Sequence, residues 1–150
     1  MASGPRDIFE EIREPLSRMA ERLEYFGERP DFAAVLKLCG NAFIIGIAAL
    51  VADVLSVAAG GDVPAEDAMK VIELFSPAGI IAGRGKHMIA RNYSTNFELA
   101  MARKDVRLML ETAGDLPLAA LPCLAARMDT LIAAGHGTED LAVIGKDAVQ

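Results

Sequence analysis

Cysteine and histidine are scarce in this chain, which has two of each among its 150 residues, and tryptophan is absent. Disulfide frameworks and structural zinc sites need more of these residues at closer spacing. His87 and His136 have no ligand-like spacing to each other or to the cysteines, so we expect no metal site. Cys39 and Cys123 lie within apolar helical patterns. We expect both to be buried free thiols in a reducing, cytoplasmic compartment.

Concentrated positive charge is also missing. The formal net charge is −6 and the isoelectric point is near 4.9, which argues against a nucleic-acid partner. The segment Met1–Asp7 has no basic region followed by an apolar core, so a signal peptide is not expected. The uncharged run from Leu38 to Ala52 has 15 residues, whereas a membrane-spanning helix needs about 20. We therefore expect a buried core helix and no membrane partner.

Apolar residues, in contrast, make up 53% of the chain, and the mean hydropathy is +0.31. One domain with a sizeable core is expected. The apolar positions recur at helical spacing and are separated by glycine and proline, which predicts an all-α fold, a helical bundle around one long central helix. The predicted helices span residues 5–24, 30–59, 62–75, 77–91, 97–113, 116–135 and a short segment after an N-cap at Thr138, while residues 23–26 form an edge strand or a connector.

The predicted long helix, residues 30–59, is apolar on every face in its middle, from Phe43 to Val51. Such a helix must be covered on every face, and a chain of 150 residues has few other helices for this. We therefore expect a second copy of the chain to supply part of the cover. Five methionines at apolar positions are also expected in the core: Met69, Met88, Met101, Met109 and Met128.

Lys37 and Asn41 are four residues apart near the start of this helix, so they lie on one face. Core helices rarely carry a lysine unless it is paired or functional. One interpretation is structural: the lysine reaches water along its aliphatic stem and the asparagine bonds nearby backbone. The functional interpretation is a lysine general acid that protonates a carbonyl oxygen, with the amide holding the substrate.

A second group comprises Phe97, Lys104 and Asp105. Phe97 and Lys104 are seven residues apart, which corresponds to one face of a predicted helix. The charges around them also have a structural interpretation, a solvated helix face, which is the usual meaning of such a run. The glycine-rich, basic segment Gly83–His87 lacks the spacing of a phosphate-binding loop and follows no strand. We interpret it as a bend between helical turns.

Taken together, these residues resemble the C-terminal helical domain of the β-hydroxyacid dehydrogenases, the relatives of 3-hydroxyisobutyrate dehydrogenase and 6-phosphogluconate dehydrogenase. In that family a Lys-x-x-x-Asn motif opens the long helix, as Lys37 to Asn41 does here, and a later Phe-x7-Asp stretch is matched by Phe97 to Asp105. The segment 137–141 is similar to the C-terminal end of the family's helical domain. Residues 23–28 are similar to the last strand of the family's nucleotide-binding domain. The similarity is collinear from about Ile8 to the end.

The resemblance implies a role for each of these residues. Lys37 would be the catalytic acid or base and Asn41 would position the substrate. Phe97 and Asp105 would border the substrate or the nicotinamide, and Lys104 would contact the cofactor. It also implies NAD or NADP as cofactor of the parent enzyme and a homodimer formed through this domain. Residues 1–29 would then be a remnant or linker, and residues 30–150 the catalytic and dimerisation domain.

The chain departs from the family pattern in two places. The family usually has Gly-x-Gly six and four residues before the lysine, where this chain has Asp31-Phe32-Ala33. The dinucleotide-binding fingerprint Gly-x-Gly-x-x-Gly after a strand is also missing. We therefore expect this chain to be a domain of an NAD(P)-dependent oxidoreductase for small 3-hydroxy acids or semialdehydes, inactive alone and without tightly bound cofactor. The alternatives are a non-catalytic helical dimerisation module and an imine reductase-like domain; Lys37 argues against the latter, because imine reductases commonly lack a lysine there.

Overall fold

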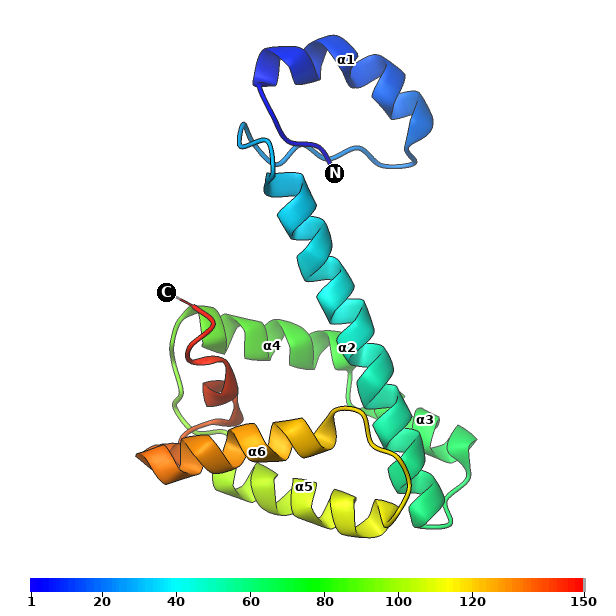
Figure 1. The fold of residues 1–150 in the computed structure, drawn as a ribbon, viewed down its shortest axis with the longest axis vertical. Helices are drawn as coiled ribbons and strands as arrows, with labels where there is room; N and C mark the ends of the chain where they lie inside the picture. Colours follow the sequence, from blue (N-terminus) through cyan, green and yellow to red (C-terminus); the bar gives the residue numbers. More distant parts are fainter. Residues whose placement is uncertain (150) are drawn as a thin grey trace. The chain divides into compact units, whose positions relative to one another are not determined.

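The computed structural model describes residues 1–149, and those residues are helical with no β-sheet. The helices in chain order are α1 (Arg6–Met19), α2 (Phe32–Gly60), α3 (Ala65–Leu74), α4 (Pro77–Ile89), α5 (Leu99–Ala113) and α6 (Leu121–Leu131), followed by the short turns η1 (Ile132–His136) and η2 (Leu141–Gly145) (Figure 1). The predicted all-α fold is confirmed. The chain forms two compact units, Met1–Ala48 and Ala49–Gln150, with the division inside α2.

The first unit is held together around α1 and the segment that follows it. The ring of Phe9 stacks on that of Tyr25 with 4.6 Å between centroids, and the Tyr25 hydroxyl donates a hydrogen bond of 2.8 Å to the Gly4 carbonyl. Ala2 and Tyr25 form a single parallel β-bridge. The segment 23–26 is therefore a connector with one bridge, and the helix predicted to reach residue 24 ends at Met19.

The helix α2 has 29 residues, close to the predicted 30–59. Its large apolar side chains between Phe43 and Ile47 are exposed, so the predicted buried core helix is not observed at these positions. By length and composition, α2 is the one helix within residues 1–149 that could cross a membrane, a test that core helices of soluble proteins also pass. Cover by a second copy of the chain, and the absence of a membrane partner, remain predictions.

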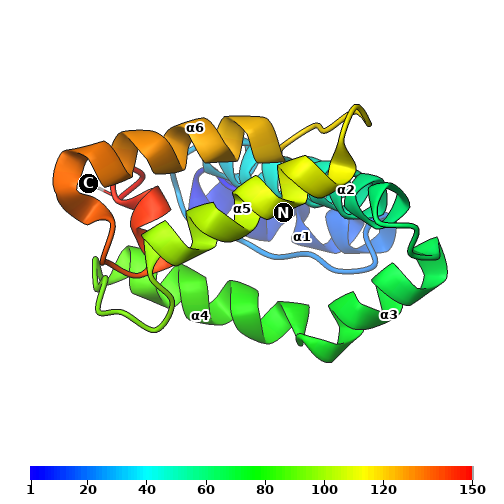
Figure 2. The ribbon, with the colours of Figure 1, turned by 90° about the horizontal axis from the view of Figure 1, so that it is seen from below.

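The core of the second unit lies mainly between α5 and α6. These helices run antiparallel and side by side (Figures 1 and 2). Their apolar residues recur every three or four positions, so each helix has one apolar stripe that faces the other. The buried cluster consists of Leu99, Ala102, Val106, Leu121, Ala125, Met128, Leu131 and Val143. It positions the loops around η1 and η2 against the start of α5.

The last residue of α2, Gly60, lies against the end of α5. A Cβ atom built at Gly60 would be 2.0 Å from the carbonyl oxygen of Thr112. No side chain fits at that distance. Glycine at this position therefore allows the two helices to approach each other at the level of their backbones.

Several local predictions were wrong. Cys39 and Cys123 are free but exposed, because each lies on an exposed face of its own helix. Helix α5 begins at Leu99, so Phe97 precedes it and does not share a helix face with Lys104. The segment 83–87 is continuous helix within α4 rather than a bend, since none of its residues requires a positive φ.

The remaining corrections concern the C-terminal third and the methionines. The helix predicted over 116–135 begins only at Leu121, and the final turn is capped by Asp140 instead of Thr138. The Asp140 side chain accepts a hydrogen bond from the Ala142 amide, which is the capping interaction that Thr138 was expected to make. Of the methionines expected in the core, Met128 is buried, Met88 is partly buried, and three are exposed: Met69, Met101 and Met109.

Candidate functional site

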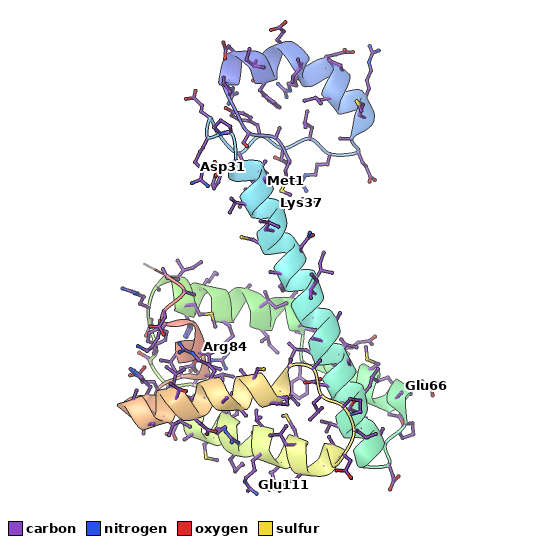
Figure 3. All side chains as sticks on the ribbon, in the orientation of Figure 1. Met1, Asp31, Lys37, Glu66, Arg84 and Glu111 are labelled. Carbon is purple, nitrogen blue, oxygen red and sulfur yellow. The ribbon has the colours of Figure 1, made fainter. Side chains whose placement is uncertain are left out.

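Lys37 lies near the start of α2, within the first unit (Figure 3). Asn41 follows it one helical turn later on the same helix. Both residues are exposed. Among residues 1–149, no ion-pair or hydrogen-bond partner is found for the Lys37 ammonium group. The amine is therefore free to meet a ligand in solvent, as a general acid must be.

Phe97, Lys104 and Asp105 lie in the second unit. The Nζ atom of Lys104 is 3.0 Å from an Oδ atom of Asp105, and both side chains are well exposed. The two charges therefore offset each other at the surface of α5. Phe97 lies just before this helix, where its N–H donates to Asp140 over 3.1 Å.

The two groups thus belong to different units of the structure. Within the first unit, the lysine and the amide share one helix face, as predicted. Within the second, the lysine and the carboxylate are adjacent, and the phenylalanine lies in the loop. A shared catalytic pocket formed by both groups stays a prediction.

The most highly connected polar group in the second unit is one that sequence reasoning missed. Asp140 is fully buried. Its carboxylate forms an ion pair with Arg84 of α4 and accepts hydrogen bonds from the N–H groups of Asn96, Phe97 and Ala142. It therefore joins α4, the loop before α5 and η2. The sequence signal was an aspartate immediately before a helical turn, the N-cap position. The sequence pattern had instead predicted Thr138 at that position.

This environment changes the acidity of Asp140. Burial acts to raise its pKa, but the Ala142 N–H, the Arg84 guanidinium and the N–H groups of Asn96 and Phe97 lower the pKa from 3.8 to about 2. The charged form is thus strongly favoured in the folded chain.

Acid should therefore destabilise the folded protein in a specific pH range. Because the pKa of Asp140 is lower in the folded than in the unfolded chain, the unfolded chain takes up the proton first as the pH falls. The stabilisation is complete above about pH 4 and is lost as the pH falls from 3.8 towards about 2. It amounts to about 2 kcal/mol. Urea unfolding across this range measures it; a flat free energy of unfolding would contradict the assignment.

A second buried carboxylate, Asp53 of α2, has a comparable structural role. It accepts hydrogen bonds from the backbone N–H groups of Ala119, Ala120 and Leu121 at 2.5, 2.9 and 2.7 Å. Burial acts to raise the pKa of Asp53, but these three donors outweigh it and lower the pKa. The carboxylate satisfies amides at the start of α6, which would otherwise lack partners.

Comparison with known proteins agrees with this helical architecture. A family model described as NAD-binding of NADP-dependent 3-hydroxyisobutyrate dehydrogenase matches residues 32–145. No curated protein matches the chain.

Three solved structures illustrate the similarity of the fold. An imine reductase from Myxococcus stipitatus in complex with NADP+ is 19% identical, with a TM-score of 0.85 over 95% of this chain and 52% of that one. An imine reductase from Pseudomonas sp. is 20% identical, with a TM-score of 0.82 over 97% and 52%. A reductive aminase from Aspergillus terreus, in complex with NADPH4, cyclohexanone and allyl amine, is 14% identical, with a TM-score of 0.78 over 95% and 51%.

The chain thus spans about half the length of the solved structures that it matches. At these identities the structures show the fold alone. The family model, however, covers residues 32–145, which is well over half of the chain. The chain belongs to the family of NAD-binding helical domains of NADP-dependent 3-hydroxyisobutyrate dehydrogenase.

Proposed function

We propose that the chain is the catalytic and dimerisation domain of an NAD(P)-dependent oxidoreductase that interconverts small 3-hydroxy acids and semialdehydes. The observation that carries the proposal is the family match over residues 32–145. The matched range contains the residues that resemble the family motifs: Lys37, Asn41, Phe97 and Asp105. Lys37 would transfer the proton at the substrate oxygen. The hydride would come from a bound nicotinamide, which supplies the redox chemistry.

The substrate class can be tested with a chimera. The nucleotide-binding half of an NADP-dependent 3-hydroxyisobutyrate dehydrogenase would be joined to Met1 of the chain. We expect the chimera to reduce NADP+ with 3-hydroxyisobutyrate, measured at the NADPH absorbance band, and the purified chain alone to show no turnover.

The alternatives predict different results in the same assay. A folded chimera that binds NADPH but turns over no substrate would support the non-catalytic dimerisation module. Reduction of a cyclic imine in preference to a semialdehyde would support an imine reductase, a class found among the structural neighbours. Circular dichroism and NADPH fluorescence distinguish an inactive chimera from an unfolded one.

We further propose that the chain is a homodimer through α2. The exposed side chains that support this are apolar and lie within five consecutive residues of the helix: Phe43, Ile44, Ile45 and Ile47. Apolar surface of this kind on a soluble protein usually marks an interface. At about 25 cal/mol per Å² of buried apolar area, covering several such side chains gives a substantial driving force.

Light scattering at micromolar concentration should give twice the chain mass of 15.9 kDa. Ile45→Glu should yield a monomer, because it would place a charge in the interface. Leu74→Glu in α3 is the matched control, since Leu74 is also highly exposed and apolar, and it should leave the dimer intact. A monomeric parent chain would contradict the proposal.

A further inference from the structure

A hollow on α4 is not used by the proposed function. It has a volume of about 240 Å³ and lies entirely within the second unit. At about 30 Å³ per water molecule, it has room for about eight waters or a small organic acid. Its lining carries a cation, an imidazole and an amide but no carboxylate: Gly79, Ile80, Gly83, Arg84, His87 and Asn96.

The side chain of Arg84 is held in position by an ion pair. Its guanidinium pairs with Asp140, which is fully buried. The two oxygens of that carboxylate also accept three backbone N–H groups, so they are saturated. Arginine has five N–H donors, and among residues 1–149 one of those of Arg84 has a hydrogen-bond acceptor. The remaining donors of a fixed guanidinium are suited to a carboxylate or phosphate group.

His87 also lines the hollow. Its Nδ1 atom is buried and has no hydrogen-bond partner among residues 1–149. Because that atom is closed off from solvent, a ligand in the hollow would contact another part of the imidazole ring. Asn96, on the loop opposite, contributes an exposed side-chain amide with two further donors.

Two glycines of α4 line the hollow and place no side chain in it. Gly79, Gly83 and His87 follow one another at intervals of four residues on α4, so they share a face. Neither glycine has a positive φ, and glycine weakens a helix interior relative to alanine. A Cβ atom built at Gly83 would meet nothing within 4 Å. The absent side chain at Gly83 therefore leaves space in the hollow.

We propose that this hollow binds a small oxyanion, the carboxylate or phosphate group of a small molecule, through Arg84, His87 and Asn96. The proposal does not depend on the catalytic assignment, because it concerns binding to the second unit alone.

The test uses the full chain and two probes, 3-hydroxypropionate and inorganic phosphate, titrated separately into isotopically labelled protein. The amide resonances of Gly79, Gly83 and Asn96 should shift saturably with at least one probe, at concentrations up to tens of millimolar. The probe that binds more tightly identifies carboxylate or phosphate as the preferred group. Absence of saturable shifts with both probes would overturn the proposal.

A pair of variants locates the site. Gly83→Leu should weaken binding about tenfold or more, because its side chain would occupy the hollow. Gly85→Leu is the matched control: it lies on the same helix, a Cβ there also meets nothing within 4 Å, and Gly85 does not line the hollow. It should bind like the parent chain. Equal loss in both variants would overturn the proposal, and Gly83→Ala repeats the test with a smaller group if Gly83→Leu does not fold.

Discussion

Replacing Lys37 with methionine should lower the turnover number of the active chimera by about 10²–10⁴-fold, the usual contribution of one general acid or base. Methionine keeps the length of the side chain and removes the proton donor. Lys37 is exposed on α2 and has no partner within residues 1–149, so the substitution should leave the fold intact. The measurement is steady-state kinetics with 3-hydroxyisobutyrate and NADP+.

The matched control is Lys70→Met. Lys70 is an exposed lysine of α3, 2.7 Å from Asp67, and lies outside the proposed site. It should retain parental kcat and KM. A Lys37→Met chimera with parental kcat would show that proton transfer does not involve this amine. The oxidoreductase assignment would then lack its acid–base residue, even if cofactor binding persisted.

Replacing Asp140 with alanine should destabilise the chain by about 3 kcal/mol or more, because each buried N–H group left without an acceptor costs about 1–3 kcal/mol. The guanidinium of Arg84 and the N–H groups of Asn96, Phe97 and Ala142 would all lose their acceptor. Urea unfolding followed by circular dichroism measures the change at neutral pH, where the carboxylate is charged.

Asp129→Ala provides the comparison. Asp129 also pairs with an arginine, at 2.8 Å from the Nε atom of Arg103, but its side chain is 58% exposed. Exposed pairs contribute at most about 1 kcal/mol, so this variant should unfold near the parental midpoint. Equal effects at both positions would show that the buried network around Asp140 does not stabilise the fold as described.

The fold was largely predictable because apolar periodicity identifies helices, and the bounds of α2 and α4 follow from it and from the adjacent prolines and glycines. The first residues of α5 and α6 were harder to predict. Leu99 and Ala100 donate their N–H groups to the carbonyls of Glu139 and Gly137, about forty residues away. A local pattern contains no information on such contacts, so it placed the start of α5 too early.

The candidate site was predictable only in part. The family motifs predict Lys37 and Asp105 as site residues, and their roles stay proposals. The structural role of Asp140, in contrast, depends on Arg84, 56 positions earlier in the chain. Arg84 was grouped with its glycine neighbours as a bend because its partner is distant in sequence. The exposure of Cys39 was likewise unpredictable. An apolar sequence pattern identifies a helix face but does not show whether other residues of the chain bury that face.

The contact at Gly60 constrains how the second unit can vary. With the Thr112 carbonyl 2.0 Å from where a Cβ atom would lie, position 60 is closed to every side chain while α2 and α5 keep this separation. A homologous domain with a larger residue there must hold the two helices further apart. It would then have to fill the resulting gap with bulkier side chains, so the residue at this position reports the spacing of the two helices.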